Sequence, residues 1–273
     1  MSLRNTVRSL PALLRVGFAE AVAYRAELLV WVLATTMPLI MLALWTAVAR
    51  DAPIEGNGRR FGEDELTAYF LATFVVRQLT GSWAAWEISM DVRQGNLSMR
   101  LLRPVHPLFT YAIENVAALP MRLVVAIPVA VFLLATLGNA QLTTDPVLWA
   151  MFVVSLFGGW LVTLFINLSI GCLALYIESS AKVMDVYLAA FFVMSGYIVP
   201  VSLFPAGVRA AGDVLPFRYQ IGLPVELMTR AYEGQRELAL EMLGRQWLHV
   251  ALGLLVTMVV WRRGLKRFEA YGG

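Results

Sequence analysis

The chain has 273 residues, of which 59% are apolar or aromatic and only 15% are charged. Soluble domains hold roughly 45–50% apolar and about 25% charged residues, so this composition excludes an ordinary soluble protein. The net charge of +3 is small and gives no reason to expect nucleic-acid binding. A membrane-spanning helix needs roughly 20 mostly apolar residues, and the chain contains several runs of that kind.

The first element is an amphipathic stretch within residues 1–25. Between Leu10 and Arg25 the apolar side chains share one helical face, while Arg15 and Glu20 lie elsewhere on the helix. This pattern is typical of a helix that lies in the membrane interface. A cytoplasmic extension of the first span is the alternative. The apolar face consists of Leu10, Leu13, Leu14, Phe18, Ala21 and Val22.

Six apolar runs follow, and they predict an all-α integral membrane protein with six transmembrane helices in a single domain, residues 1–273. The third run has an alternative start near Phe109, which would place Arg122 deeper in the bilayer. The fourth run is longer than a bilayer requires, so we expect it to tilt or protrude. The runs are Leu28–Val48, Leu66–Ser89, Pro120–Leu137, Val147–Ile177, Val183–Leu203 and Met242–Trp261.

Lysine and arginine residues near the ends of the runs predict the orientation of the chain. With the N-terminus inside, the cytoplasmic segments hold more of these residues than the outer segments do. The outer loops hold most of the acidic residues, which agrees with that orientation. We therefore expect both termini on the cytoplasmic side.

Polar residues inside the second run share one helical face, because they recur at steps of three and four. An arginine at bilayer depth must face the bundle interior, a partner or water. The face therefore indicates a translocation route or a subunit contact, or else a structural arginine paired with a carboxylate of another span. Its residues are Thr73, Arg77, Thr80, Ala84, Glu87 and Asp91.

Small and weakly polar residues recur every four positions in the fourth run. Residues of this kind let helices approach closely and share hydrogen bonds. Packing within one subunit is the simpler interpretation of this ladder, and a contact with a second subunit is the alternative. The ladder consists of Ser155, Gly159, Thr163, Asn167 and Gly171.

Residues 91–107 follow the second run on the predicted cytoplasmic side. Within them, Asn96 to Arg103 is predicted to form a short amphipathic helix, with Asn96 as its N-cap and Pro104 ending it. Such a helix suits a groove of a partner protein, and contact with lipid headgroups is the alternative. The segment combines Arg93, Arg100 and Arg103 with the apolar residues Leu97, Met99, Leu101 and Leu102, which a solvated loop would not need.

A proline-rich segment separates the fifth and sixth runs. Residues 203–232 remain fairly apolar, as expected of short broken helices that enter the outer leaflet and return. We therefore expect a re-entrant helical pair, and a compact loop on the outer membrane surface is the alternative. Prolines suit the starts and breaks of such helices, and the segment offers Pro200, Pro205, Pro216 and Pro224.

Signatures of enzymes are missing from the sequence. The predicted topology puts His106 and His249 on opposite sides of the membrane, which argues against a paired-histidine metal site within one subunit. Neither of the two lysines follows a glycine, so the phosphate-binding loop of ATPases is absent. We expect a chain with no catalytic residues, no metal and no bound cofactor.

The order and spacing of these motifs resemble the permease subunits of type 2 ABC exporters. The passage Asp91-Val92-Arg93-Gln94-Gly95-Asn96-Leu97, followed by Leu101-Leu102-Arg103-Pro104-Val105, is similar to an R-x-G-x-L … L-L-x-P passage in a subfamily of these permeases. The stretches Leu203-Phe204-Pro205, Leu215-Pro216-Phe217 and Leu223-Pro224-Val225-Glu226 resemble the outer segment of that subfamily. The likeness covers nearly the whole chain.

The resemblance implies a bacterial inner-membrane permease that pairs with a second copy or with a similar second permease, surrounded by membrane lipid. Two separate ATPase subunits would bind from the cytoplasm and hold ATP and magnesium. A lipid, an antibiotic, a peptide or a polysaccharide would fit as substrate. The ATPase-coupling residues would be Asp91, Arg93, Gly95, Leu97, Arg100, Leu101 and Arg103. The translocation path or subunit interface would include Thr73, Arg77, Thr80, Glu87, Ser155, Gly159, Thr163 and Asn167.

Two other classes of membrane protein compete with this interpretation. A secondary transporter or channel would need no ATPase, and such folds often show internal repeats and helix breaks near the midplane. We find no clear repeat, and the predicted breaks lie near the outer end. A membrane enzyme would need a catalytic cluster, which the sequence does not offer.

The predicted topology can be tested by cysteine labelling. Cysteines introduced at Gly58 and Asn139 should react with an impermeant thiol reagent added to intact cells, because both positions lie in predicted outer loops. A cysteine at Ser98 should not react. Native Cys172 lies within the fourth run, so the unaltered chain serves as the background control and should not be labelled. Labelling of Ser98→Cys in sealed, correctly oriented cells would show that the true orientation is the reverse of the predicted one.

Overall fold

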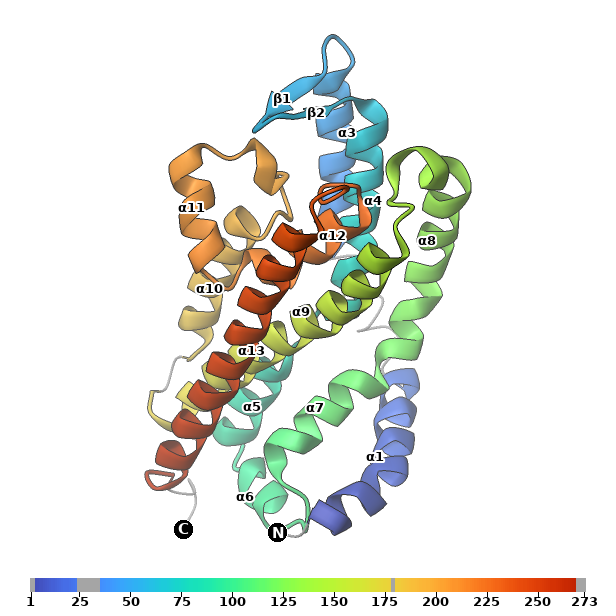
Figure 1. Ribbon diagram of the computed structural model, residues 1–273. Helices are drawn as coiled ribbons and strands as arrows, with labels where there is room; N and C mark the ends of the chain where they lie inside the picture. Colours follow the sequence, from blue (N-terminus) through green and yellow to red (C-terminus); the bar gives the residue numbers. More distant parts are fainter. Residues whose placement is uncertain (1–2, 24–34, 178–179, 269–273) are drawn as a thin grey trace.

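A computed structural model describes residues 3–23, 35–177 and 180–268 of the chain. This part is mostly helical and contains one antiparallel β-hairpin (Figure 1). The first half holds α1 Leu3–Ala23, α3 Met37–Ala49, β1 Ile54–Gly56, β2 Arg59–Phe61, α4 Glu63–Thr80, α5 Ala84–Arg93, α6 Asn96–Leu101, α7 Pro107–Ala117 and α8 Leu119–Gln141. The second half holds α9 Pro146–Cys172, η1 Leu173–Leu175, α10 Ser180–Met194, η2 Val201–Leu203, α11 Ala206–Val214, η3 Arg218–Gln220, α12 Gly222–Met228 and α13 Arg236–Leu265.

The elements divide between two ends of the molecule (Figure 1). One end, called the hairpin end, holds β1, β2 and α11. The opposite end, called the α6 end, holds α6 together with the beginning of α1 and the end of α13. The first and last described helices therefore reach the same end of the molecule, as an even number of membrane crossings requires.

Three helical stretches of the described chain are long and apolar enough to cross a membrane, namely Pro107–Gly138, Pro146–Leu175 and Arg236–Leu265. They correspond to the third, fourth and sixth predicted runs. The third run coincides with α8, and α7 precedes it, so the whole stretch begins at Pro107 and contains Arg122. An all-α membrane protein is thereby confirmed, and the number of six spans stays a prediction. Residues 28–34 of the first run lie outside the described residues.

The second predicted run, Leu66–Ser89, is not one continuous helix. α4 ends at Thr80, Gly81 is extended, and α5 begins at Ala84. Arg122 of α8 donates from Nη1 to the carbonyl oxygens of Gly81 at 2.7 Å and Gln78 at 3.4 Å. A carbonyl that a helix end leaves unpaired needs another donor when it is buried. The expectation of a single helix is corrected because a side chain from α8 supplies that donor.

The fifth predicted run, Val183–Leu203, is α-helical only as far as Met194, and its last three residues form the short helix η2. The chain then turns through Gly196, whose φ is +85°, a conformation that favours glycine. The hydroxyl of Tyr69 on α4 donates to the carbonyl oxygen of Gly196 at 2.7 Å, and both groups are buried. The run is therefore shorter than predicted, and a contact with α4 stabilises its end.

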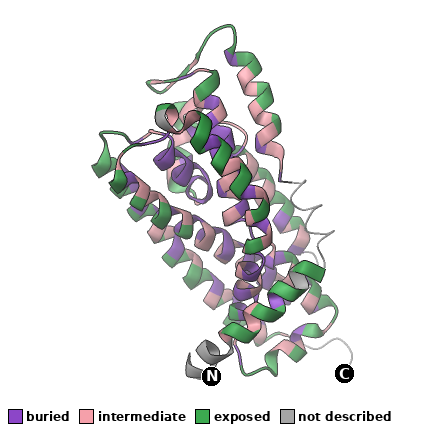
Figure 2. Ribbon diagram, turned by 90° about the vertical axis from the view of Figure 1, so that its right-hand side faces the viewer, coloured by how far each residue is buried: buried purple, intermediate pink, exposed green. Residues whose placement is uncertain are grey.

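Residues 203–232 contain two short helices, α11 and α12, joined through η3. Pro205 immediately precedes α11 and Pro224 lies in the first turn of α12, positions where proline fits a helix. All seven residues of α12 are buried, and Figure 2 shows buried residues gathered in the interior with exposed ones on the outer helices. The two helices agree with the predicted pair, and their entry into a membrane leaflet stays a prediction.

α9 lies at the centre of the helices, and its glycines allow three neighbours to approach closely. A Cβ added at Gly159 would lie 2.9 Å from the carbonyl oxygen of Gln220 in η3. One added at Gly171 would lie 2.9 Å from Ile88 of α5, and one at Gly158 the same distance from Gln246 of α13. The small residues of the predicted ladder therefore pack against segments of the same chain.

Buried apolar side chains form two main clusters, one toward each end. The larger cluster joins α4 to α8, α10 and α12 and includes Tyr69 and Phe191. The second joins α5, α6, α7, α9 and α13 and includes Leu97 and Trp261. α1 packs outside both clusters along α7, where an added Cβ at Gly17 would lie 2.8 Å from the Cβ of Ala117. Its location in a membrane interface stays a prediction.

Replacement of Gly159 by alanine tests the packing of α9. The added Cβ would meet a backbone oxygen at 2.9 Å, which cannot rotate away as a side chain can. We expect a loss of about 1–3 kcal/mol, measured as a lower thermal midpoint of the purified protein in detergent.

Gly244→Ala on α13 is the matched control for this substitution. Nothing lies within 4 Å of its added Cβ, and alanine favours a helix over glycine by about 1 kcal/mol. The midpoint of this control should stay the same or rise. Equal midpoints for both variants would contradict a steric limit at Gly159.

Candidate functional site

The segment after α5 is organised around Arg100 of α6. Its Nε lies 2.6 Å from a carboxylate oxygen of Asp91 on α5, and its Nη1 lies 2.8 Å from one of Glu114 on α7. The hydroxyl of Tyr111 donates to the same oxygen of Asp91 at 2.6 Å, and the guanidinium lies 4.4 Å from the centre of the Tyr111 ring. Burial lowers the pKa of Arg100, but Glu114 and Asp91 outweigh burial and raise it above its ordinary value. This cluster joins α5, α6 and α7.

The apolar residues of the segment divide between core and surface. Leu97 is fully buried in the cluster of apolar side chains at the α6 end, so a partner cannot contact it as the sequence suggested. Leu102 is 80% exposed, Met99 65% and Leu101 37%. These three residues, called the α6 patch, form the apolar surface that the segment offers.

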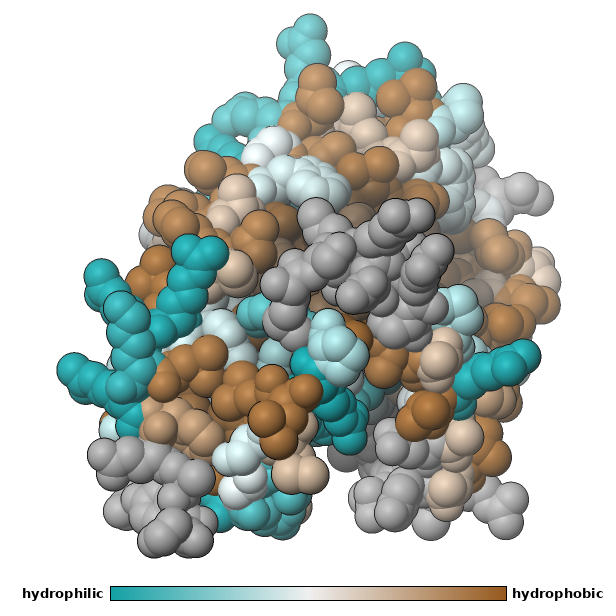
Figure 3. Space-filling view, turned by 90° about the horizontal axis from the view of Figure 1, so that it is seen from below, coloured by the Kyte–Doolittle hydropathy of each residue, from teal (hydrophilic) through white to brown (hydrophobic). Residues whose placement is uncertain are grey.

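Exposed basic residues occur at the same end of the molecule as the α6 patch. Arg93 and Arg103 of the segment are exposed, as are Arg262, Arg263, Lys266 and Arg267 at the end of α13. Figure 3, which views this end, shows hydrophilic side chains projecting beside apolar ones. Gly95 also belongs to the predicted coupling residues. It has a φ of +75° and forms the tight turn between α5 and α6, a role that suits glycine.

His106 connects the segment to α7 and α13. Its Nδ1 accepts a hydrogen bond from the backbone N–H of Leu108 at 3.3 Å and so caps α7. Its ring centre lies 5.7 Å from that of Trp261 on α13. Burial, followed by the nearby charge of Arg262, lowers the pKa of His106.

Arg77 of α4 is stabilised by aromatic rings. Its guanidinium lies 5.0 Å from the centre of the Phe191 ring and 6.0 Å from that of Tyr197, distances that suit cation–π contacts. In the described part of the chain it forms no ion pair. The carboxylate partner that the sequence suggested is therefore not found among these residues.

The other members of the predicted polar face do not form one continuous stripe, because the helix breaks at Gly81. Thr73 and Thr80 are buried and donate to carbonyl oxygens of their own helix. Glu87 lies on α5 and accepts a hydrogen bond from the indole of Trp83 at 2.6 Å. The break therefore separates the residues of the predicted polar face that lie on α4 from those that lie on α5.

The ladder of α9 is buried and faces η3, α13 and, at Gly171, α5. The amide of Gln246 donates to the carbonyl oxygens of Ser155 at 2.9 Å and Tyr219 at 2.7 Å. The Oε1 of Gln220 accepts from the hydroxyls of Thr163 at 3.1 Å and Tyr187 at 2.6 Å. These contacts favour packing within one subunit as the role of the ladder.

Sequence reasoning missed a buried ionic cluster at the hairpin end. Arg218 of η3 forms ion pairs with Asp213 of α11 and, at 2.7 Å, with Glu226 of α12. The hydroxyl of Tyr232 lies 3.2 Å both from Glu226 and from Arg218. The signal was present in the sequence as charged residues within an otherwise apolar segment, but their pairing depends on the fold.

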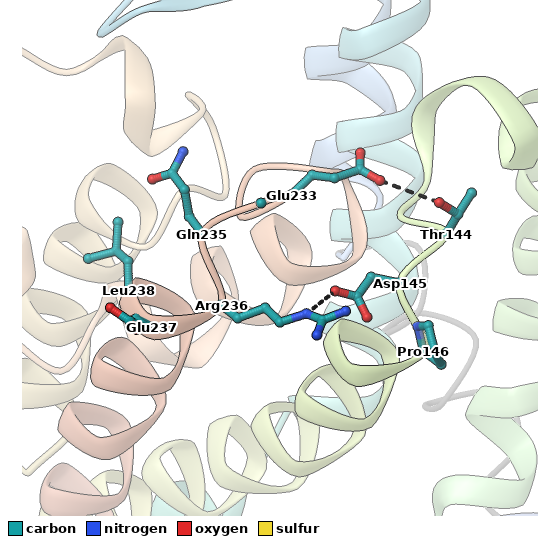
Figure 4. Close-up of a pocket in the computed structure, with 9 residues that line it drawn as sticks. Thr144, Asp145, Pro146, Glu233, Gln235, Arg236, Glu237 and Leu238 are labelled. Atoms are coloured by element: carbon teal, nitrogen blue, oxygen red, sulfur yellow. Dashed lines mark hydrogen bonds and ion pairs between the residues drawn. The ribbon is translucent and has the colours of Figure 1, made fainter.

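A depression at the hairpin end lies between the beginnings of α9 and α13 (Figure 4). Its volume is about 760 Å³. The Nε of Arg236 lies 2.5 Å from an oxygen of Asp145 and lowers the pKa of that carboxyl. Glu233 accepts a hydrogen bond from Thr144 at 3.4 Å. Arg236 and Asp145 are already paired, and Glu233, Arg236 and Glu237 are exposed, so the depression offers no buried charged group to a ligand.

Within the described residues, no group of three or more His, Cys, Asp or Glu side chains is placed to hold a metal ion. His106 contacts the end of α13, whereas His249 lies against Tyr219 with ring centres 4.8 Å apart. Cys172 is buried. The functional features of the described chain are therefore the α6 patch, the interior arginines and the polar groups of the hairpin end.

Residues 63–272 match a family model described as ABC-2 family transporter protein. No curated protein matches the chain. Because the match covers well over half of the residues, the chain belongs to the ABC-2 family of transporter proteins. Together with its apolar helices, this makes it a multi-pass membrane protein and a membrane component of an ABC transporter, which implies partnership with an ABC ATPase.

Replacement of Arg100 tests the cluster that joins α5, α6 and α7. Arg100→Met would leave Asp91 and Glu114 close together without the cation between them. We expect a loss of about 3 kcal/mol, measured as a lower thermal midpoint in detergent. Arg100→Lys keeps the charge but not the forked geometry, so its loss should be smaller.

Arg103→Met is the matched control, because Arg103 is an exposed arginine of the same segment. Surface substitutions of this kind usually change stability by less than about 0.5 kcal/mol. If Arg100→Met and Arg103→Met lowered the midpoint equally, the cluster would not be what holds α6 in place.

Proposed function

We propose that this chain is the membrane subunit of an exporter and that separate ATPase subunits, which hold ATP and magnesium, drive it. The chain itself carries no catalytic residue in this proposal. The observation that carries the proposal is the α6 patch. Met99, Leu101 and Leu102 turn outward at the end of the molecule where α1 begins and α13 ends, and this patch is the docking surface for the ATPase.

The α6 patch has the composition of a protein contact. Apolar anchors surrounded by charged side chains are typical of helices that bind in a groove of a partner. The rim consists of exposed arginines, among them Arg93 and Arg103. A helix of six residues would not hold this surface alone, but the ion pairs of Arg100 fix α6 to α5 and α7. A surface fixed before binding loses less entropy on binding.

The contacts of α6 also suggest how a movement of the ATPase reaches the membrane. The Arg100 cluster joins α6 to α5 and α7, and α5 packs against α9 where Gly171 meets Ile88. Arg122 links the beginning of α8 to the break between α4 and α5. A displacement of α6 is therefore carried into the central helix α9 and into α8 through packed or hydrogen-bonded groups.

In this proposal the α6 end, with both termini, faces the cytoplasm of a bacterial cell, and the hairpin end faces outward across the inner membrane. The outer surface of α8 is apolar, with Val124, Val131 and Phe132 each more than half exposed, as expected of a surface in contact with lipid. Two permease chains, identical or similar, form the complete route. Thr73, Arg77, Thr80 and Glu87 stay the candidates for residues near that route.

Acidic substitutions in the α6 patch test the docking surface. The double variant Met99→Asp, Leu102→Asp should still insert in the membrane but should lose its ATPase during purification, because charges replace the apolar anchors. The ratio of ATPase to permease in the purified complex is the measurement. Leu97 is unsuitable for this test, because it is fully buried and its replacement would destabilise the permease itself.

Leu240→Asp is the control for the docking experiment. Leu240 is 59% exposed and lies on the first turns of α13, away from the α6 end. This variant should keep its ATPase. The docking assignment is wrong if the double variant also retains the ATPase at normal stoichiometry and continues to transport.

A further inference from the structure

A pocket of about 240 Å³ lies at the hairpin end, where the β-hairpin, α11, η3, α12 and α13 meet. Its volume is below the roughly 300–1,000 Å³ of sites for drug-sized ligands, so it suits a single charged group rather than a large molecule. The polar side chains that line it include Asn57, Arg59, Arg209, Asp213, Arg218 and Glu226.

The two carboxylates of this pocket share one arginine. Asp213 and Glu226 both pair with Arg218, whose side chain is only 10% exposed. The hydroxyl of Tyr232 contacts both Arg218 and Glu226. This triad contributes a rigid wall with a net negative charge of one, and the remaining charges of the lining are both positive.

Arg59 and Arg209 supply those positive charges. Arg59 is oriented by two contacts, a hydrogen bond from Nη2 to the carbonyl oxygen of Thr229 at 3.0 Å and a position 5.1 Å from the centre of the Phe61 ring. Neither contact neutralises its charge. Arg209 of α11 is half-buried, and among the described residues it forms no ion pair. The pocket therefore has an excess of one positive charge and unoccupied guanidinium donors.

We propose that this pocket binds a phosphoryl group, with Arg209 and Arg59 as its ligands. Guanidinium groups match the oxygens of a phosphate in pairs, and two of them suit a group that carries one or two negative charges. A lipid headgroup and a soluble phosphate ester share this chemistry.

The surroundings of the pocket favour the lipid as the source of that group. α11, which carries Arg209, also exposes Val208 and Val214, which are 40% and 74% accessible. A lipid whose headgroup occupies the pocket would lay its acyl chains along such apolar side chains. The elements that line the pocket lie at the end opposite the α6 patch, and no residue of that patch lines it, so this proposal does not rest on the proposed ATPase docking.

Binding can be measured on the purified full-length chain in a phosphate-free maltoside detergent. The probes are dihexanoyl phosphatidylglycerol, glycerol 3-phosphate, and dihexanoylglycerol, which lacks the phosphate. We expect saturable binding of the phosphatidylglycerol. Arg209→Gln should weaken this binding at least roughly tenfold, because a charge-assisted hydrogen bond is lost.

Two further variants keep the experiment decisive. Arg60→Gln removes an exposed arginine of the same hairpin that does not line the pocket, so it should leave the affinity unchanged. Leu238→Trp narrows the pocket from α13 without altering its charge and should also weaken binding. Thermal midpoints near that of the unaltered chain would show that both pocket variants remain folded.

Binding of phosphatidylglycerol without binding of glycerol 3-phosphate would identify the lipid as the source. Binding of both probes, or of glycerol 3-phosphate alone, would assign the pocket to phosphate esters in general. Equal binding of dihexanoylglycerol, no binding of either phosphate probe, or an affinity that Arg209→Gln and Arg60→Gln change equally would overturn the proposal.

Discussion

The close approach of neighbouring segments to α9 is the constraint on which the rest of the fold depends. Gly159 allows the backbone of η3 to touch the helix, and Gly171 does the same for α5 near the other end. Because interiors are densely packed, a larger side chain at Gly159 would displace η3, and one at Gly171 would displace α5. The glycines of one helix therefore set the relative positions of the hairpin end and the α6 end.

Three arginines form ion pairs or hydrogen bonds at the junctions between helices. Arg100 joins three helices at the α6 end, Arg218 joins α11, η3 and α12 at the hairpin end, and Arg122 holds the break between α4 and α5. Each donates several hydrogen bonds from a planar group, which suits a junction between elements that meet at different angles. Charged residues are few in this chain, and these three arginines connect its helices whatever function they also have.

The sequence predicted features that depend on local pattern and missed those that depend on distant partners. The spacing of Gly159 and Gly171 predicted close helix packing, and three of the apolar runs correspond to helical stretches long and apolar enough to cross a membrane. The interruption at Gly81 depends on a donor 41 residues later in the chain, which no local pattern reveals. For the same reason the sequence could not separate Leu97, which packs into the core, from Leu101, which faces outward. Helical spacing gives the same face to both residues, and only the positions of α5 and α7 decide which is covered.

The break between α4 and α5 bears on how the chain is inserted into a membrane during synthesis. α4 begins with three acidic residues and carries Arg77, and α5 carries Glu87 and Asp91. A charge at the centre of an isolated helix opposes insertion by about 2.5–3.5 kcal/mol. The guanidinium that satisfies the break belongs to α8, which the ribosome makes later. The carbonyl oxygen of Gly81 therefore has its side-chain donor only after α8 has been made and packed beside it, so the junction of α4 and α5 is completed by a later part of the chain.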